Sequence, residues 1–223
     1  MEVPFKNPTI FLGSLRVDEP ITTATDFLVA GVGILAFFSL ARIMQSTHVR
    51  WFRWFFLITA VSTLVSSLIG HAFNYHFGIE ARIYGWVLGV ASATAAQFAA
   101  TYHARAYIKP QTFRVLMIFN IMESIAALVA TLWFRKFVVV EIHSAVALLF
   151  ILLPLEWYIF AKTKSVLGKN MVIGVLLSVV AVTCHVAKLA MSEWFNHMDL
   201  AHVFMAASMY VMYKGVQSER QTP

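Results

Sequence analysis

Long runs of apolar residues, separated by short polar connections, make up most of the chain. Each run is about 20 residues long, which is the length of a helix that crosses the roughly 30 Å hydrocarbon core of a bilayer. The runs do not alternate between polar and apolar positions, so they do not suit a transmembrane β-barrel. The pattern predicts an all-α integral membrane fold, a bundle of seven transmembrane helices, at Thr22–Ile43, Arg53–Phe73, Ile83–Tyr102, Thr112–Phe134, Val138–Phe160, Asn170–Met191 and Met198–Tyr213.

The connections between these runs contain no linker or low-complexity stretch, so residues 1–223 are interpreted as a single domain. Pro20 and Pro110 each precede a run, which is typical of a helix start. Residues 1–20 are mixed in character and are expected to lie in the membrane interface. They lack the basic start and sustained apolar stretch of a cleavable signal peptide.

Composition supports the membrane assignment. The chain is 60% hydrophobic and only 13% charged, with a mean hydropathy of +0.74, which a soluble domain does not carry. The net charge of +6 does not indicate nucleic-acid binding, because the basic residues fall at the ends of the apolar runs. Cys184 is the single cysteine, so no intrachain disulfide can form. We expect a multi-pass protein of a plasma or inner membrane, in contact with lipid and free to form oligomers.

The distribution of lysine and arginine predicts the orientation, because cytoplasmic loops are enriched in these residues. With seven spans, six of the 17 basic residues fall on the side of the N-terminus. The N-terminus is therefore expected outside and the C-terminus in the cytoplasm. The other eleven are Arg42, Arg50, Arg53, Arg105, Lys109, Arg114, Lys162, Lys164, Lys169, Lys214 and Arg220.

Histidines and acidic residues gather near the outer ends of the predicted helices. Such groups are costly at membrane depth and often mark a site, although side chains near helix ends can also reach the interface. Glu123 lies near the middle of the fourth run, so its side chain cannot reach the interface. It should therefore be neutral or paired, and the sequence does not identify its partner. The outer set is His71, His76, His143, His185, His197, His202, Glu19, Glu80, Glu141, Glu193 and Asp199.

Two short motifs within this set could bind a metal ion. Ser67 and His71 lie four residues apart on one face near the end of the second helix. In the seventh helix Asp199 lies about 60° around the axis from His202, whereas His197 lies about 140° away unless it belongs to the preceding loop. Imidazole and carboxylate suit zinc, and a catalytic zinc uses three protein ligands and one water. His71 and His202, with either Asp199 or His197, would supply that set.

The seven helices, Ser67 and His71, the acidic start of the first helix at Glu19-Pro20 and the histidine opening the last together resemble the CREST superfamily. This superfamily includes the alkaline ceramidases and the adiponectin and progestin-type receptors. The resemblance implies an intramembrane zinc site that activates water for amide hydrolysis. It also implies that His71 and His202 bind the metal and that Ser67 polarises the substrate or the oxyanion.

The sequence departs from the family pattern in two places. Met198 occupies the position of the first histidine of the family's seventh-helix pair, so the third ligand falls to His197 or Asp199. Glu80 and Arg82 occupy the region where the family has an aspartate. We lean toward His197 as the ligand, reaching in from the loop, with Asp199 as its carboxylate partner or as the general base.

Three functions are compatible with these residues. The first is a zinc-dependent membrane hydrolase that acts on a lipid amide or ester near the outer face. The second is a receptor-like or structural seven-helix protein in which a metal joins helices two and seven. The third is a haem or retinal protein, although the last helix has no lysine before Lys214 for a retinal Schiff base. Ser66 and Ser67 could also be small packing residues, and Asp199 could be a helix N-cap.

Overall fold

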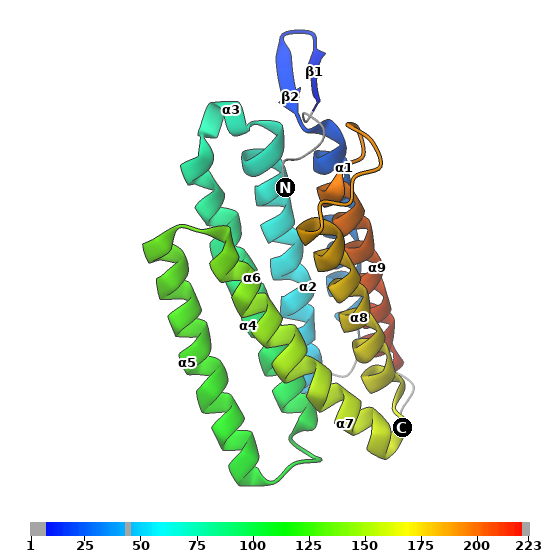
Figure 1. Cartoon of the computed structure of the whole chain (residues 1–223). Helices are drawn as coiled ribbons and strands as arrows, with labels where there is room; N and C mark the ends of the chain where they lie inside the picture. Colours follow the sequence, from blue (N-terminus) through cyan, green and yellow to red (C-terminus); the bar gives the residue numbers. More distant parts are fainter. Residues whose placement is uncertain (1–7, 43–45, 220–223) are drawn as a thin grey trace.

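The computed structural model describes residues 8–42 and 46–219 as a bundle of long helices topped by a short β-hairpin (Figure 1). The hairpin consists of β1 Thr9–Leu12 and β2 Leu15–Asp18. The α-helices are α1 Pro20–Leu40, α2 Thr47–Val65, α3 Asn74–Phe77, α4 Ile83–Ala104, α5 Pro110–Phe134, α6 Phe137–Ala145, α7 Leu153–Thr163, α8 Val166–Val186 and α9 His197–Ser218. The π-helical segment η1 Ser66–Ala72 continues α2, and the π-helical segment η3 Val146–Leu152 connects α6 to α7. The 3₁₀ turn η2 Ile79–Arg82 leads into α4.

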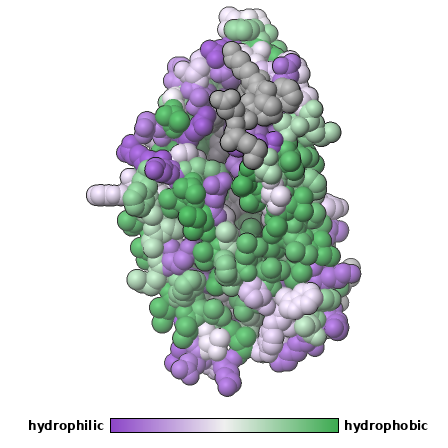
Figure 2. All heavy atoms as spheres, viewed as in Figure 1, coloured by the Kyte–Doolittle hydropathy of each residue, from purple (hydrophilic) through white to green (hydrophobic). Residues whose placement is uncertain are grey.

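Six of these segments are long and apolar enough to cross a membrane: Pro20–Leu40, Thr47–Ala72, Ile79–Ala104, Pro110–Phe134, Phe137–Thr163 and Val166–Val186. The predicted all-helical, multi-pass membrane character is therefore confirmed at this level. α9 has 22 residues but carries more polar side chains and is not among the six. It packs along α8 and α1 (Figure 1). Figure 2 shows hydrophobic residues over most of the middle of the molecule and hydrophilic residues gathered toward its ends.

Some helices begin or end at other residues than the sequence predicts, at places where the chain is only weakly polar. α8 ends at Val186 rather than Met191, because Lys188 adopts a positive φ of 55° and the following residues form a loop. α2 begins at Thr47 rather than Arg53, since basic residues at a membrane surface do not stop a helix. Ile43, the expected end of the first helix, lies outside the described residues.

Two of the long helices contain a π-helical segment. η3 runs directly into α7, whose second residue is Pro154. Proline lacks the backbone N–H and clashes with the preceding turn, which accounts for a wider turn there. η1 contains no proline, yet it carries Ser67 and His71. Segments of this kind occur frequently at functional sites.

The hairpin lies at the end of the bundle where α1 begins, and α9 ends at the opposite end (Figure 1). Its strands pair antiparallel, with Thr9 opposite Asp18, around a turn in which Gly13 has a φ of +64°. Partial burial tends to raise the pKa of Asp18, but hydrogen bonds from Arg16 and Thr9 outweigh it and hold the pKa below its ordinary value. The hairpin was not expected from the mixed character of residues 1–20.

α1 and α2 approach closely at Gly33. A Cβ atom there would lie 2.6 Å from the carbonyl oxygen of Phe56 and 2.9 Å from the Cβ of Ala60. Small residues that allow such approach are typical of helix contacts within membranes. Gly31, two residues earlier on α1, has open space around the equivalent position. The α1–α2 contact therefore depends on Gly33 and not on Gly31.

We predict that Gly33→Ala destabilises the protein by about 1–3 kcal/mol, because α1 must move away from α2. Gly31→Ala is the matched control, and it should be neutral or stabilising by up to about 1 kcal/mol because alanine favours helix. Reversible unfolding in mixed micelles measures both. Equal effects of the two substitutions would contradict the close α1–α2 contact.

Candidate active site

Three helices bring ionisable side chains together at the hairpin end of the bundle. α1 packs against both η1 and α9, so its first turns lie between the two elements that carry the predicted histidines. Asp26 extends from α1, His71 from η1 and His202 from α9. The rings of His71 and His202 lie with their centroids 6.5 Å apart, on elements that both pack against α1.

The carboxylate of Asp26 lies between the two imidazoles. Its Oδ1 atom is 3.4 Å from Nε2 of His202, and its Oδ2 atom is 3.9 Å from Nε2 of His71. Asp26 is only 2% exposed, and Oδ2 has no hydrogen-bond partner among the described residues. A buried acceptor without a donor is costly. The arrangement therefore favours a proton or a cation between the carboxylate and the imidazoles.

The other nitrogen of each imidazole is engaged on the side away from Asp26. Nδ1 of His71 lies 2.6 Å from a carboxylate oxygen of Glu19, which only accepts, so this Nδ1 carries the proton. The Thr25 hydroxyl donates its proton to the carbonyl of Thr22, so it accepts from Nδ1 of His202 at 3.1 Å. In the neutral form of each ring, Nε2 then presents a lone pair toward Asp26.

This pattern is the one that metal-bound histidines show. A ligating imidazole almost always donates its other N–H to a carboxylate or another oxygen acceptor, which fixes the tautomer. Glu19 performs this function for His71 and Thr25 for His202. Two imidazoles and a carboxylate also form a common ligand set of catalytic zinc.

The distances between these donors permit a quantitative test of fit. Zinc bonds of about 2.1 Å in a tetrahedral site place neighbouring ligand atoms about 3.4 Å apart. The contact between His202 and Asp26 already has that length, and the contact between His71 and Asp26 is about half an ångström longer. Among the described residues, no three His, Cys, Asp or Glu groups are already arranged to hold a metal ion. The donor types suit zinc, but the two contacts use different oxygen atoms of Asp26 and do not by themselves define a three-donor site.

Ser67 lies one turn before His71 and is fully buried. Its hydroxyl donates to the backbone carbonyl of Thr23, 3.1 Å away, and so connects η1 to α1. The hydroxyl therefore holds the two helices together at the level of the site. Its polarising role, which the family resemblance implies, stays a prediction.

The start of α9 separates Asp199 from His197. Asn196 is the N-cap, and Asp199 closes a capping box by accepting from the Asn196 backbone N–H at 2.6 Å. Asp199 thus occupies the third helical position and not the N-cap that the sequence suggested. Its second oxygen, Oδ1, is buried without a hydrogen-bond partner among the described residues. Asp199 precedes His202 by three residues, so both belong to one face of α9.

His197 is the first residue of α9, so it does not belong to the loop. Its Nε2 lies 3.3 Å from the ammonium of Lys188, and its ring lies 5.3 Å from that of His185. The helical geometry places it about 140° around the axis from His202. Among the described residues the contacts found for His197 are with Lys188 and His185, whereas the carboxylate that contacts both His71 and His202 is Asp26.

Asp26 was not selected from the sequence. A signal was present, because it is an acidic residue within an otherwise apolar run, and Thr22 and Thr23 precede it by four and three residues, at positions that share its helical face. Ionisable residues inside a span face the bundle interior by default.

A second buried polar cluster connects α4, α5 and α6. Glu123 accepts from Gln97 at 3.0 Å and lies 2.7 Å from Nδ1 of His143, which is the partner that the sequence did not identify. Nε2 of His143 lies 3.1 Å from the carbonyl of Val90, which can only accept, so this nitrogen carries a proton. One further proton is then shared between His143 and Glu123, and the pair is neutral overall.

Comparison with known proteins adds a family but no activity. A family of unknown function, DUF6962, matches residues 21–221 of the chain. The matched region contains Asp26, Ser67, His71, Asp199 and His202. No curated protein matches the chain.

Proposed function

We propose that this chain, which belongs to the DUF6962 family of unknown function, is a zinc-dependent membrane hydrolase that cleaves a lipid amide or ester. The observation that carries the proposal is the geometry around Asp26. Two imidazoles, whose Nδ1 atoms face oxygen acceptors, direct Nε2 toward one buried carboxylate, whose Oδ2 atom has no hydrogen-bond donor among the described residues. The resemblance to the CREST superfamily supplies the reaction class.

The proposed topology has seven spans, with the hairpin outside and the end of α9 in the cytoplasm. Six segments can cross a membrane by length and composition, and α9 packs along two of them. The excess of lysine and arginine supports the orientation. The site around Asp26 then lies close to the outer face, where the fatty-acyl linkage of an outer-leaflet lipid is accessible.

Each residue has a role that follows from its contacts. His71, His202 and Asp26 would hold the zinc ion, which lowers the pKa of a bound water and polarises a carbonyl group. Glu19 and Thr25 orient the two imidazoles through their Nδ1 atoms. Asp199, whose Oδ1 is buried without a hydrogen-bond partner among the described residues, is the candidate general base for that water.

A second function is favoured by the same geometry. The three residues belong to three different helices, α1, α2 with η1, and α9, so a bound metal would join these helices whether or not it catalyses a reaction. This corresponds to a receptor-like protein with a structural metal. Stoichiometric zinc without turnover on lipid amides or esters would favour it over the hydrolase.

Elemental analysis of the purified protein, followed by chelation, tests the proposal. We expect about one zinc per chain, loss of lipid amide or ester hydrolysis on chelation, and its recovery on addition of zinc. His202→Ala should lose the metal, and His197→Ala should keep it because His197 contacts Lys188 instead. Metal-free protein that hydrolyses lipid at the original rate would refute the role of zinc.

A further inference from the structure

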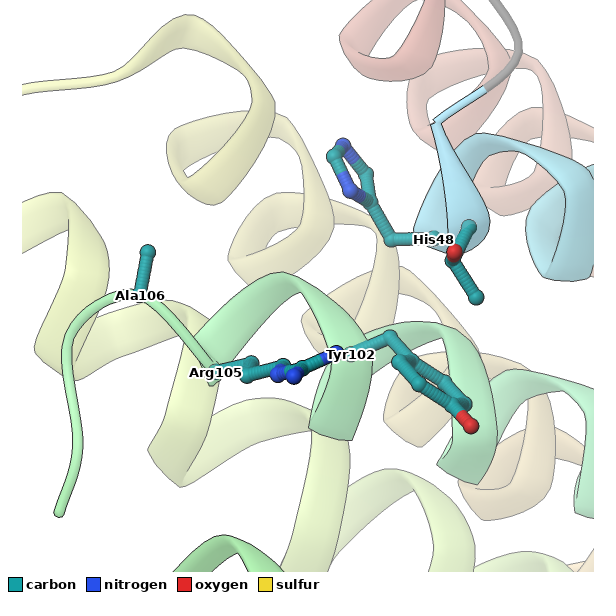
Figure 3. Close-up of a pocket in the computed structure, with 5 residues that line it drawn as sticks. His48, Tyr102, Arg105 and Ala106 are labelled. Carbon is teal, nitrogen blue, oxygen red and sulfur yellow. The ribbon is translucent and has the colours of Figure 1, made fainter. Parts of the chain in front are cut away.

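A pocket of about 380 Å³ lies at the end of the bundle opposite Asp26. It is lined by Thr47 and His48 at the start of α2 and by Tyr102, Arg105 and Ala106 at the end of α4. Figure 3 shows these two segments on either side of the pocket. Pockets of this size are large enough to hold a small molecule or a headgroup. The pocket is independent of the proposed active site.

The side chains that line the pocket are mainly hydrogen-bond donors. Arg105 is exposed and lies over the ring of Phe113, 5.3 Å from its centroid, and among the described residues it forms no ion pair. The Tyr102 ring packs on the same Phe113, with centroids 5.5 Å apart. Stacking on one aromatic ring holds both side chains at the pocket and leaves the guanidinium N–H groups available.

The start of α2, at Thr47 and His48, lies at the same pocket. Ser46 is its N-cap but makes no side-chain capping hydrogen bond, so the first N–H groups of the helix lack that partner. The positive end of the helix dipole favours an anion at this position. Thr47 contributes a hydroxyl at the first helical position.

The neighbouring carboxylates are already paired with histidines. His48 lies 3.3 Å from Glu219, and this hydrogen bond lowers the pKa of Glu219 below its ordinary value. The His48 ring stacks on His103, which donates to both oxygens of the buried Glu156 at 2.9 and 3.0 Å. Each of these carboxylates is bound by a histidine, and among the described residues neither forms an ion pair with Arg105.

We propose that this pocket binds a phosphate group. Arg105 supplies a charge-assisted fork, and Tyr102, Thr47 and the start of α2 supply the remaining donors. The phosphate belongs either to the headgroup of an acidic lipid or to a soluble phosphorylated compound. Basic pockets between transmembrane helices on the cytoplasmic side have the chemistry that acidic headgroups require.

The test measures the thermal unfolding midpoint of the protein in a zwitterionic detergent during two titrations. One uses inorganic phosphate and the other a short-chain phosphatidylglycerol. The protein should be stabilised in at least one titration, with apparent affinity about tenfold weaker in Arg105→Gln. The loss reflects one charge-assisted hydrogen-bond pair. Stabilisation by the lipid alone identifies a headgroup site, and stabilisation by phosphate identifies a site for soluble phosphate compounds.

Arg114→Gln is the matched control, because Arg114 is also exposed at this end of the bundle and carries the same charge. Its affinity should equal that of the wild type. Tyr102→Phe removes one hydroxyl while keeping the ring on Phe113, and it should weaken binding two- to threefold, on the order of one neutral hydrogen bond. Absence of stabilisation in both titrations, or equal affinity of Arg105→Gln and Arg114→Gln, would overturn the proposal.

Discussion

Under the proposed function, Asp26→Asn is expected to reduce lipid hydrolysis more than 100-fold and to remove most of the bound zinc. The substitution keeps the shape of the side chain but replaces the anionic ligand between His71 and His202 with a neutral amide. Groups that only orient a ligand typically contribute about 10–100-fold in metal affinity or activity. Loss of a ligand itself should therefore cost more. Zinc content and the initial rate on the same preparation measure the two effects.

Two further substitutions provide comparisons for the zinc content and activity of Asp26→Asn. Glu19→Gln changes the group that orients His71 through Nδ1, so it should lower activity by about 10–100-fold. Asp18→Asn, in the hairpin at the same end of the molecule, should leave both zinc content and rate unchanged because its contacts are with Thr9 and Arg16. Retention of full zinc content in Asp26→Asn would remove Asp26 from the ligand set.

Glu123→Ala is expected to destabilise the protein by about 3 kcal/mol, because it leaves the buried His143 without its partner. A single hydrogen bond within a membrane contributes less, about 0.6 kcal/mol on average. Glu123→Gln offers an amide N–H to the unprotonated Nδ1 of a neutral His143 and should cost about that smaller amount. Reversible unfolding in mixed micelles separates the two predictions.

The double substitution Glu123→Leu with His143→Phe completes the test. Replacing both members by apolar residues of similar volume removes the unpaired group, so the double variant should be more stable than Glu123→Ala. If the losses of stability in Glu123→Leu and His143→Phe add up to the loss in the double variant, the two residues do not act as a unit. α5 is exposed along most of its length, so this pair is a main attachment of the helix to the bundle.

The class of fold was predictable from the sequence because hydrophobic runs of sufficient length have few alternatives. Every long helix coincides with a predicted run, and the errors lie at the ends, as at Lys188. The positions of His71 and His202 at one end of the bundle were also predictable, because alternating helix direction follows from the number of runs between them. Residue type and position along a helix were enough for these conclusions.

The third member of the candidate site depended on contacts between helices. From the sequence, the choice of the third metal ligand was limited to Asp199 or His197, because both are close to His202 in the same helix. Spacing within one helix gives no information about which face of α1 meets α9. The α1–α2 contact at Gly33 and the packing of α1 on α9 decide that Asp26 faces the imidazoles.

The sequence by itself determined an all-helical membrane protein with histidines at one end, because the length and hydropathy of each segment are local properties that the bilayer selects. The tertiary structure decided which side chains lie together: Asp26 with both imidazoles, Glu123 with His143, and Arg105 at the same pocket as Thr47 and His48. Each of these contacts depends on how one helix is rotated relative to another. The close packing of small and polar side chains between the helices determines that rotation.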